Sequence, residues 1–303
     1  MDLNAVRILV EVVDRGSFTA AARAVGLPTS SVSRRVAQLE RDLGVPLLIR
    51  TTRKLAVTEA GRLYLDRARE AVRSLTEAGE LATEAGTEPR GRVRVTAPND
   101  SGFLLAPALV DFLRLHPGIE TDLLLTSRSV DIVSESIDLA IRGSGRLEDS
   151  SLIARRVGPS PVRLFAAPSY LAERGTPRRL ADLARHECVL YRSSDGTARW
   201  VLDGPRGRET VEVRGRLCSD DIGFCRHAAA AGGGVTLVPG VIAAPFVADG
   251  RLVGVLPRYG LLTGGLYLVH AGGRALPRRV ALLRDFLFEA LQPLVEREPG
   301  AVK

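Results

Sequence analysis

Cysteine and histidine are scarce in this chain. Its 303 residues include 3 cysteines and 4 histidines. Cys188, Cys218 and Cys225 form an odd and irregularly spaced set, which argues against a disulfide framework and for a reducing compartment. The cysteines and histidines also lack the spacing of a zinc site, and scattered histidines alone do not indicate a catalytic triad. The sequence therefore predicts no metal site.

Long apolar runs are absent as well. No stretch approaches the roughly 18 consecutive apolar residues that a membrane-spanning helix needs. The first segment, MDLNAVRILVEVVDRG, carries acidic residues in and around a short apolar run and has no small-residue cleavage site, unlike a secretory signal. We therefore expect a cytoplasmic protein with no membrane partner.

Apolar and basic residues are both plentiful. With 303 residues and 45% hydrophobic content, the chain is long enough for two or three globular units with cores of their own. Lys and Arg number 42 against 35 Asp and Glu, which gives a formal net charge of +7. A basic balance suggests an anionic partner, although it also contributes to solubility.

The segment 16–42, GSFTAAARAVGLPTSSVSRRVAQLERD, predicts two short helices joined by a tight turn. Ser17 is suited to cap the first helix, and Gly26 is suited to end it in the left-handed conformation. Pro28 has no amide proton to lose and fits the first position of a second helix, which we expect to run through Arg41. Two helices joined in this way are typical of a helix-turn-helix.

The second of these helices has an apolar face and a polar face. Val32, Val36 and Leu39 recur at spacings of four and three, so they form one buried stripe. In helix-turn-helix proteins this helix enters the major groove of DNA, where hydroxyl and guanidinium groups contact base edges. A small helical core with a solvated charged face is the alternative. The residues expected to bind DNA in this segment are Ser17, Thr29, Ser30, Ser31, Ser33, Arg34 and Arg35.

This part of the chain resembles the DNA-binding domain of LysR-type transcriptional regulators. The match runs through GSFTAAARAVGLP and SVSRRVAQLERDLGVPLLIRTTRKLAVTEAG almost without gaps. The resemblance implies a winged helix-turn-helix in which Arg50, Arg53 and Lys54 of the wing contact phosphate, unless the segment is only a solvated loop. The family commonly has Ser-Gln-Pro where this chain has Pro-Thr-Ser at 28–30, so the docking geometry is carried over without a base preference.

A single long helix is predicted from Thr58 to about Ala85. Apolar and small residues at alternating spacings of three and four form a heptad seam, which an isolated helix could not bury. The resemblance implies the antiparallel linker-helix dimer of the family. Packing of the helix on the chain's own C-terminal domain is the alternative. The seam residues are Leu65, Ala68, Val72, Leu75, Gly79 and Ala82.

A composition change marks a domain boundary near residue 89. Proline and glycine in GTEPRG, residues 86–91, separate a helix-rich part from a part that alternates strands with helices, as α/β architecture does. We expect strands at 93–97, 121–126, 139–142, 152–157, 162–166, 188–191, 211–214, 235–238, 252–256 and 266–269. We expect helices at 101–115, 129–135, 168–173, 177–184, 221–231 and 277–294.

The C-terminal part resembles the LysR effector domain, which is similar to periplasmic binding proteins. The match is carried by GRVRVTAP, LAPALVDFLRLHPGIE, DLAIRGS, SLIARRVG, AAPSYLAERGTP and AGGGVTLVP. The resemblance implies a multi-domain chain: a winged helix-turn-helix at 1–58, a linker helix and hinge at 59–88, and a two-lobed α/β effector-binding domain at 89–303. Lobe one would comprise about 90–161 and 266–295, and lobe two about 162–265.

Loops at the carboxyl ends of strands are the expected ligand site of such a fold. Free amide protons at helix starts and the Arg142 guanidinium favour an anionic small molecule, whereas Asp100 opposes one. Helix capping and a structural ion pair of Arg142 are the alternatives. The candidate effector-binding residues, of which Ser193 and Val235 are taken from the resemblance, are Thr96, Asn99, Asp100, Ser101, Arg142, Ser193, Asp220, Asp221 and Val235.

These features together predict a sequence-specific transcriptional regulator that binds double-stranded promoter DNA and is controlled by a small-molecule effector between the two lobes. It would act as a homodimer or homotetramer, with no cofactor and no enzymatic activity. Two alternatives stay open: an α/β solute-binding or enzymatic domain with an N-terminal assembly module, and an architectural DNA binder with a vestigial pocket. Only a specific regulator should retain a large preference for promoter over random duplex at moderate salt.

Overall fold

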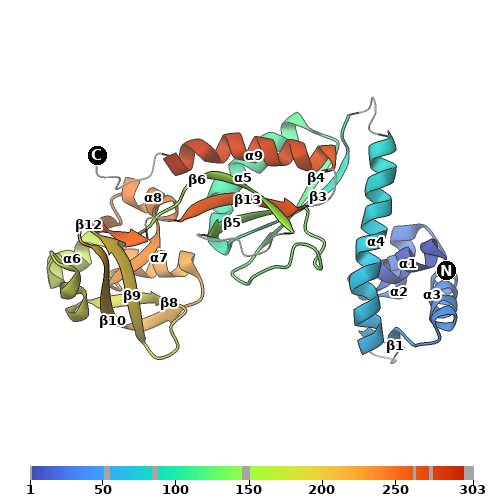
Figure 1. Ribbon diagram of the computed structural model, residues 1–303, viewed down its shortest axis with the longest axis horizontal. Coiled ribbons are helices and arrows are strands. Elements are labelled where there is room, and N and C mark those ends of the chain that lie inside the picture. Colours follow the sequence, from blue (N-terminus) through green and yellow to red (C-terminus); the bar gives the residue numbers. More distant parts are fainter. Residues whose placement is uncertain are drawn as a thin grey trace. The chain divides into compact units, whose positions relative to one another are not determined.

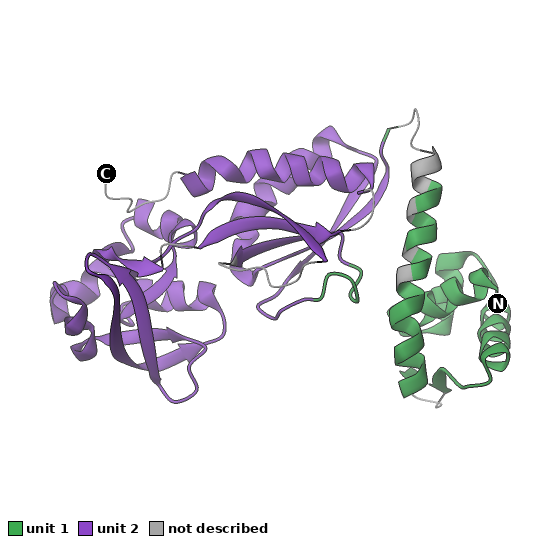
Figure 2. Ribbon diagram, in the orientation of Figure 1, with its two compact units in different colours: residues 1–88, 131–136 green, residues 89–130, 137–303 purple. Residues whose placement is uncertain are grey.

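A computed structural model describes residues 2–50, 55–83, 88–144, 151–261, 264–272 and 276–296. The chain divides into two compact units, drawn in green and purple in Figure 2. Unit 1 is Met1–Glu88 with Asp131–Ser136, and unit 2 is Pro89–Val130 with Ile137–Lys303. Within the described ranges, no helix combines the length and hydropathy needed to cross a membrane.

Helices form the core of unit 1, and the predicted caps are confirmed. Ser17 Oγ accepts a hydrogen bond from the Ala20 amide at 3.4 Å, and Gly26 ends the second helix at a left-handed φ of 69°. Pro28 stands one position earlier than predicted, as the N-cap of the third helix rather than as its first residue. The helices are α1 (Leu3–Asp14), α2 (Phe18–Val25), α3 (Thr29–Leu43) and α4 (Glu59–Thr83) (Figure 1).

A two-stranded wing follows α3. Strand β1 (Leu48–Arg50) pairs antiparallel with β2 (Leu55–Val57). Glu40 of α3 holds the start of the wing, because its Oε1 accepts hydrogen bonds from the amides of Leu47 and Leu48 at 2.8 and 2.9 Å. Unit 1 is therefore a winged helix-turn-helix continued by a long helix.

A five-stranded sheet forms lobe one of unit 2. Its strands lie in the order β4-β3-β5-β13-β6, with β3 parallel to β4 and β5, and β13 antiparallel to β5 and β6. Strand β13 comes from the end of the chain, so the lobe is built from two separate segments. The strands are β3 (Gly91–Ala97), β4 (Ile119–Leu125), β5 (Leu139–Ser144), β6 (Leu152–Pro159) and β13 (Gly265–Ala271).

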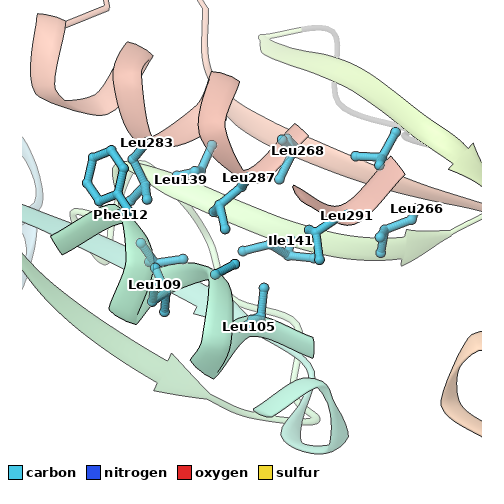
Figure 3. Packing of buried hydrophobic residues seen from close by; sticks show 14 of the residues in the cluster. Leu105, Leu109, Phe112, Leu139, Ile141, Leu266, Leu268, Leu283, Leu287 and Leu291 are labelled. Carbon is cyan, nitrogen blue, oxygen red and sulfur yellow. The ribbon is translucent and has the colours of Figure 1, made fainter. Parts of the chain in front are cut away.

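Two helices, α5 (Gly102–Leu115) and α9 (Arg278–Glu296), pack on this sheet. Figure 3 shows leucines of both helices and Phe112 of α5 directed toward each other and toward the strands. Phe112 and Leu287 are completely buried, and each such side chain contributes about 1.5–3 kcal/mol of hydrophobic stabilisation. This core fixes the β3–α5 connection, where ligand-binding residues are expected.

The six strands of lobe two close into a barrel in the order β10-β8-β11-β7-β12-β9. The strands are β7 (Val162–Ala166), β8 (Glu187–Tyr191), β9 (Thr197–Gly204), β10 (Gly207–Ser219), β11 (Val235–Pro239) and β12 (Val253–Leu261). The helices are α6 (Pro168–Arg174), α7 (Ile222–Ala230) and α8 (Gly240–Ala248), with the 3₁₀ helix η2 (Leu180–Arg185).

Two of the predicted helices differ in the structure. In place of the helix expected at 129–135, residues 132–136 form only a single turn, in which Asp131 Oδ1 accepts from the amides of Val133 and Ser134. The turn does not continue as a helix, because Ser136 adopts a left-handed φ of 55°. The helix predicted at 177–184 is the 3₁₀ helix η2 instead. A 3₁₀ helix places the side chains of residues i and i+3 on the same side. A short apolar pattern in the sequence therefore does not distinguish it from one turn of an α-helix.

Two elements of lobe two were not predicted. Helix α8 has no polar face, so the periodic signal of an amphipathic helix is missing from its sequence, GVIAAPFVA. Strand β9 does have a signal, since Ala198, Trp200 and Leu202 alternate with exposed residues. That alternation would have identified the β9–β10 hairpin from the sequence.

Candidate DNA-binding and effector sites

Helix α3 buries one face and exposes the other within unit 1. Val32, Val36 and Leu39 are buried in the core, as the sequence predicts. Thr29, Ser30 and Arg34 are exposed, while Ser31, Ser33 and Arg35 are half-buried. The hydroxyl and guanidinium groups therefore lie on the side of α3 away from the core.

Two of the predicted DNA-binding residues have structural contacts of their own. Arg35 Nη1 lies 3.3 Å from Asp2 Oδ2, and both side chains are about half exposed, so this ion pair contributes less than about 1 kcal/mol. Ser17 caps α2. A weak surface pair leaves the Arg35 guanidinium able to exchange Asp2 for another anion.

The tip of the wing, with Arg53 and Lys54, lies outside the described residues, as does the side chain of Arg50. The base of the wing is tightly packed against α4. A Cβ placed on Gly61 would overlap the carbonyl oxygen of Leu47 and lie 2.8 Å from Val57 Cγ1. Only glycine at this position allows the helix and the wing to approach so closely.

The seam of α4 changes its surroundings along the helix. Leu65 and Ala68 are 2% and 7% exposed because they belong to the hydrophobic core of unit 1, and Val72 packs against that core. Leu75 is 53% exposed and Gly79 is also exposed, while the side chain of Ala82 lies outside what the structure describes. The first turns of the seam are thus buried within the chain itself.

Hydroxyl groups at the end of β3 are occupied by their own loop. Thr96 Oγ1 donates to the Leu124 carbonyl at 3.1 Å, and Ser101 Oγ donates to the Pro98 carbonyl. Both residues are buried. Their side chains therefore fix the path of the connection between β3 and the 3₁₀ turn η1 (Asn99–Ser101).

Three further candidates have contacts in their own neighbourhood. Arg142 Nη2 donates to the Val130 carbonyl at 2.6 Å, and Ser193 Oγ donates to the Thr197 carbonyl at 2.6 Å. Val235 is completely buried in the core of lobe two, so its side chain is not available to a ligand.

Asn99 and Asp221 come together across the two lobes. Asn99 Nδ2, in lobe one, donates to Asp221 Oδ2, in lobe two, at 3.0 Å. Asp221 is also the N-cap of α7, where its Oδ1 accepts from the Phe224 amide at 2.6 Å. Asp220, next in the chain, is exposed. The loop after β3 and the start of α7 therefore meet, as the position of both at strand ends predicts.

Asp100 lies at the same junction, near Arg226, which was not among the residues predicted from the sequence. A Cβ placed on Gly223 would be 2.9 Å from Asp100 Cβ, so Asp100 sits directly against the first turn of α7. Burial raises the pKa of Asp100, and the nearby Arg226 guanidinium partly offsets that rise. Burial also lowers the pKa of Arg226, which is enclosed in lobe two beside the Phe246 ring. An arginine within the apolar segment 222–230 was the available sequence signal.

A winged helix-turn-helix followed by a two-lobed α/β domain defines a DNA-binding regulator with a ligand-binding domain. Residues 3–62 match the family described as "Bacterial regulatory helix-turn-helix protein, lysR family", and residues 86–292 match "LysR substrate binding domain". The chain belongs to the LysR family of transcriptional regulators, whose members are not enzymes.

Similar proteins span almost the whole chain. An HTH-type transcriptional regulator of Xanthomonas campestris pv. campestris is 36% identical over 96% of this chain and 86% of that protein. The HTH-type transcriptional regulator PtxR of Pseudomonas aeruginosa is 35% identical over 99% and 95%. Among solved structures, full-length AphB, a virulence activator of Vibrio cholerae, has a TM-score of 0.62 at 29% identity, covering 95% of this chain and 99% of AphB. CrgA of Neisseria meningitidis has a TM-score of 0.62 at 29% identity, covering 96% and 99%.

Proposed function

We propose that α3 lies in the major groove of promoter DNA and that its exposed polar face reads base edges. The observation that carries this proposal is the burial of Val32, Val36 and Leu39 on the opposite face. The groups directed at bases are the side chains of Thr29, Ser30, Ser31, Ser33 and Arg34. The groups directed at phosphates are those of Ser17, Arg35, Arg50, Arg53 and Lys54.

The chain acts as a homodimer or homotetramer through the exposed part of α4. Because Leu65 and Ala68 are buried within unit 1, they stiffen the start of the helix, while Val72, Leu75, Gly79 and Ala82 provide the contact between subunits. The division of roles is DNA binding at 1–58, dimerisation at 59–88 and effector binding at 89–303. The regulator works in the cytoplasm, where its DNA is.

The effector binds between the lobes, near the junction of η1 and α7. Backbone amides of the β3–α5 connection and the donors of Arg142 suit an anionic group on that molecule. Because Asn99 and Asp221 join the lobes there, a ligand that separates or reorients these side chains would shift the balance between lobe arrangements. That shift would be transmitted through α4 and would change the spacing between the DNA-binding units of the oligomer.

Footprinting on the gene's own upstream region, with and without candidate metabolites, tests this function. The expected result is an interrupted footprint whose extent changes with one metabolite. A footprint that no metabolite alters favours the architectural alternative, and the absence of any preference for this region over random duplex favours the solute-binding or enzymatic alternative.

A further inference from the structure

Three buried side-chain polar atoms have no hydrogen-bond partner within the described part of the chain, and two of them lie at the junction of the lobes. Those two are Asp100 Oδ2 in lobe one and Arg226 Nε in lobe two, and the third is Arg163 Nε. Most buried polar atoms in folded proteins are paired, because an unpaired one loses its hydration without compensation. Such atoms therefore indicate a position where a bound molecule completes the structure.

Each terminal nitrogen of the Arg226 guanidinium already has a partner, and the side chain is held in place. Arg226 is 8% exposed. Its Nη1 donates to the Ile242 carbonyl at 3.0 Å, its Nη2 lies 3.2 Å from His227 Nε2, and its guanidinium carbon is 4.5 Å from the centre of the Phe246 ring. The Nε–H group is thus held rigidly in one place, as a ligand-binding donor should be.

Asp100 and Arg226 face the same junction between the lobes. Asp100 lies against Gly223, one helical turn before Arg226 on α7. The two charges interact electrostatically. The Arg226 guanidinium carbon is also 5.6 Å from the centre of the Phe103 ring, which belongs to lobe one. The residues that carry the unpaired acceptor and the unpaired donor are therefore close to each other across the lobe boundary.

We propose that the effector places an uncharged group that both donates and accepts hydrogen bonds, a hydroxyl or a carboxamide, between Asp100 Oδ2 and Arg226 Nε. This inference rests on the proposed effector-controlled function and adds the chemistry of one part of its site. The Asp100 carboxylate accepts from the ligand, and Arg226 donates to it.

Charges of both signs lie near this position, so an ionised group of either sign meets repulsion. An ammonium group would be attracted by Asp100 and Asp221 but repelled by the Arg226 guanidinium and by Arg251, which also acts on Arg226. A carboxylate would be repelled by Asp100 and by Asp221, which lies beside it at the start of α7. A neutral donor–acceptor group satisfies both buried atoms without adding a charge to a poorly hydrated place. Any anionic part of the effector would bind elsewhere, toward Arg142.

Fragments with one polar group each test the proposal directly. Benzamide, benzyl alcohol, benzylamine and benzoate are titrated up to about 20 mM into the full-length protein, with binding followed by ligand-observed NMR. The same titrations use Asp100→Ala and Arg226→Lys, the latter keeping the charge but losing Nε–H. Asp111→Ala and Arg114→Lys, exposed on α5, serve as matched controls.

The expected result is that benzamide or benzyl alcohol binds and loses about tenfold or more in affinity in both site variants, but less than twofold in both controls. Failure of every neutral fragment to bind overturns the inference. A change of less than twofold in the affinity of Asp100→Ala for the neutral fragments also overturns the inference. This variant is sufficient for the test if Arg226→Lys does not fold. If the site variants lose as much affinity for benzylamine or benzoate as for the neutral fragments, the inference is also overturned.

The footprinting described above separates this inference from the proposed function. If a charged metabolite alters the footprint with the same affinity in wild type and in Asp100→Ala, effector control stands and the neutral-group inference fails. If neutral ligands need both residues but none alters the footprint, the chemistry of the site stands and effector control fails.

Discussion

Asn99 and Asp221 form a hydrogen bond of 3.0 Å that joins the two lobes, although they are 122 positions apart in the sequence. The same Asp221 carboxylate caps α7 through the Phe224 amide. The Asp221 side chain therefore both bonds to the neighbouring lobe and caps α7. A change in the contact between the lobes would directly alter the capping of α7.

The two partners of this bond should differ in their effect on stability. Asn99→Ala removes only the contact between lobes, whereas Asp221→Ala also removes the helix cap, which is worth about 0.5–2 kcal/mol. We expect Asp221→Ala to lower the free energy of unfolding by about 1 kcal/mol more than Asn99→Ala does, as measured by urea denaturation. Equal losses would mean that the cap contributes nothing.

Asp100 should make stability depend on pH. Its folded-state pKa is raised above 3.8, mainly by burial, with Asp221 adding to the rise and Arg226 opposing it. The folded state then binds more protons than the unfolded state between these two pKa values, so this residue's contribution to stability falls as pH rises through that window.

Asp100→Asn removes that dependence because an amide does not titrate. We expect the variant to be more stable than the wild type at pH 7, with an advantage that shrinks as the pH is lowered to about 4. Asp111→Asn, at an exposed position of α5, controls for the general loss of an acidic charge. Denaturation curves at both pH values measure the effect, and an advantage that grows toward acid would refute the assignment.

Gly61 should be needed for the attachment of the wing. A methyl group there would collide with the Leu47 carbonyl and Val57, so we expect Gly61→Ala to destabilise unit 1 by about 1–3 kcal/mol. Gly254→Ala, on β12, is the control, because a Cβ at Gly254 meets nothing within 4 Å and the position lies outside the proposed subunit contact. Thermal unfolding compares the two, and similar melting temperatures would contradict the packing argument.

Leu75 should hold the subunits together. It is 53% exposed on the seam of α4, and an aspartate there would put a charge into the proposed helix–helix contact. We expect Leu75→Asp to be monomeric in sedimentation velocity. Leu63→Asp, 69% exposed on the same helix but outside the seam, should keep the wild-type assembly. An unchanged oligomer in Leu75→Asp would remove α4 as the dimer contact.

Local chemistry made the DNA-binding unit predictable. The Ser17 cap, the Gly26 turn and the stripe of Val32, Val36 and Leu39 depend on residues a few positions apart, and the structure has all of them. The burial of Leu65 within unit 1 depends instead on which surface the helix meets, and the heptad spacing does not contain that information.

The effector region was predictable only in part. The positions of Asn99, Asp100 and Asp221 at strand ends follow from a rule of the fold, and their role in effector binding stays a prediction. Their pairing across the lobes, and the partnership of Asp100 with Arg226, arise from tertiary contacts between distant segments. The donors of Thr96, Ser101 and Arg142 favour ligand binding by their chemistry, but in the structure each side chain has a backbone carbonyl as partner.

The central claim is that the outward face of α3 reads DNA sequence. Its most direct test is competition binding of the full-length protein to its own upstream region against random duplex at about 0.15 M salt, with Arg34→Ala and Arg53→Ala compared. We predict a preference of about 1,000-fold or more for the upstream region. Arg34→Ala should lose much of it. Arg53→Ala should weaken all duplexes alike and lower the salt slope by about one. Equal affinity of the wild type for both DNAs, or the same effect from both variants, would contradict the account.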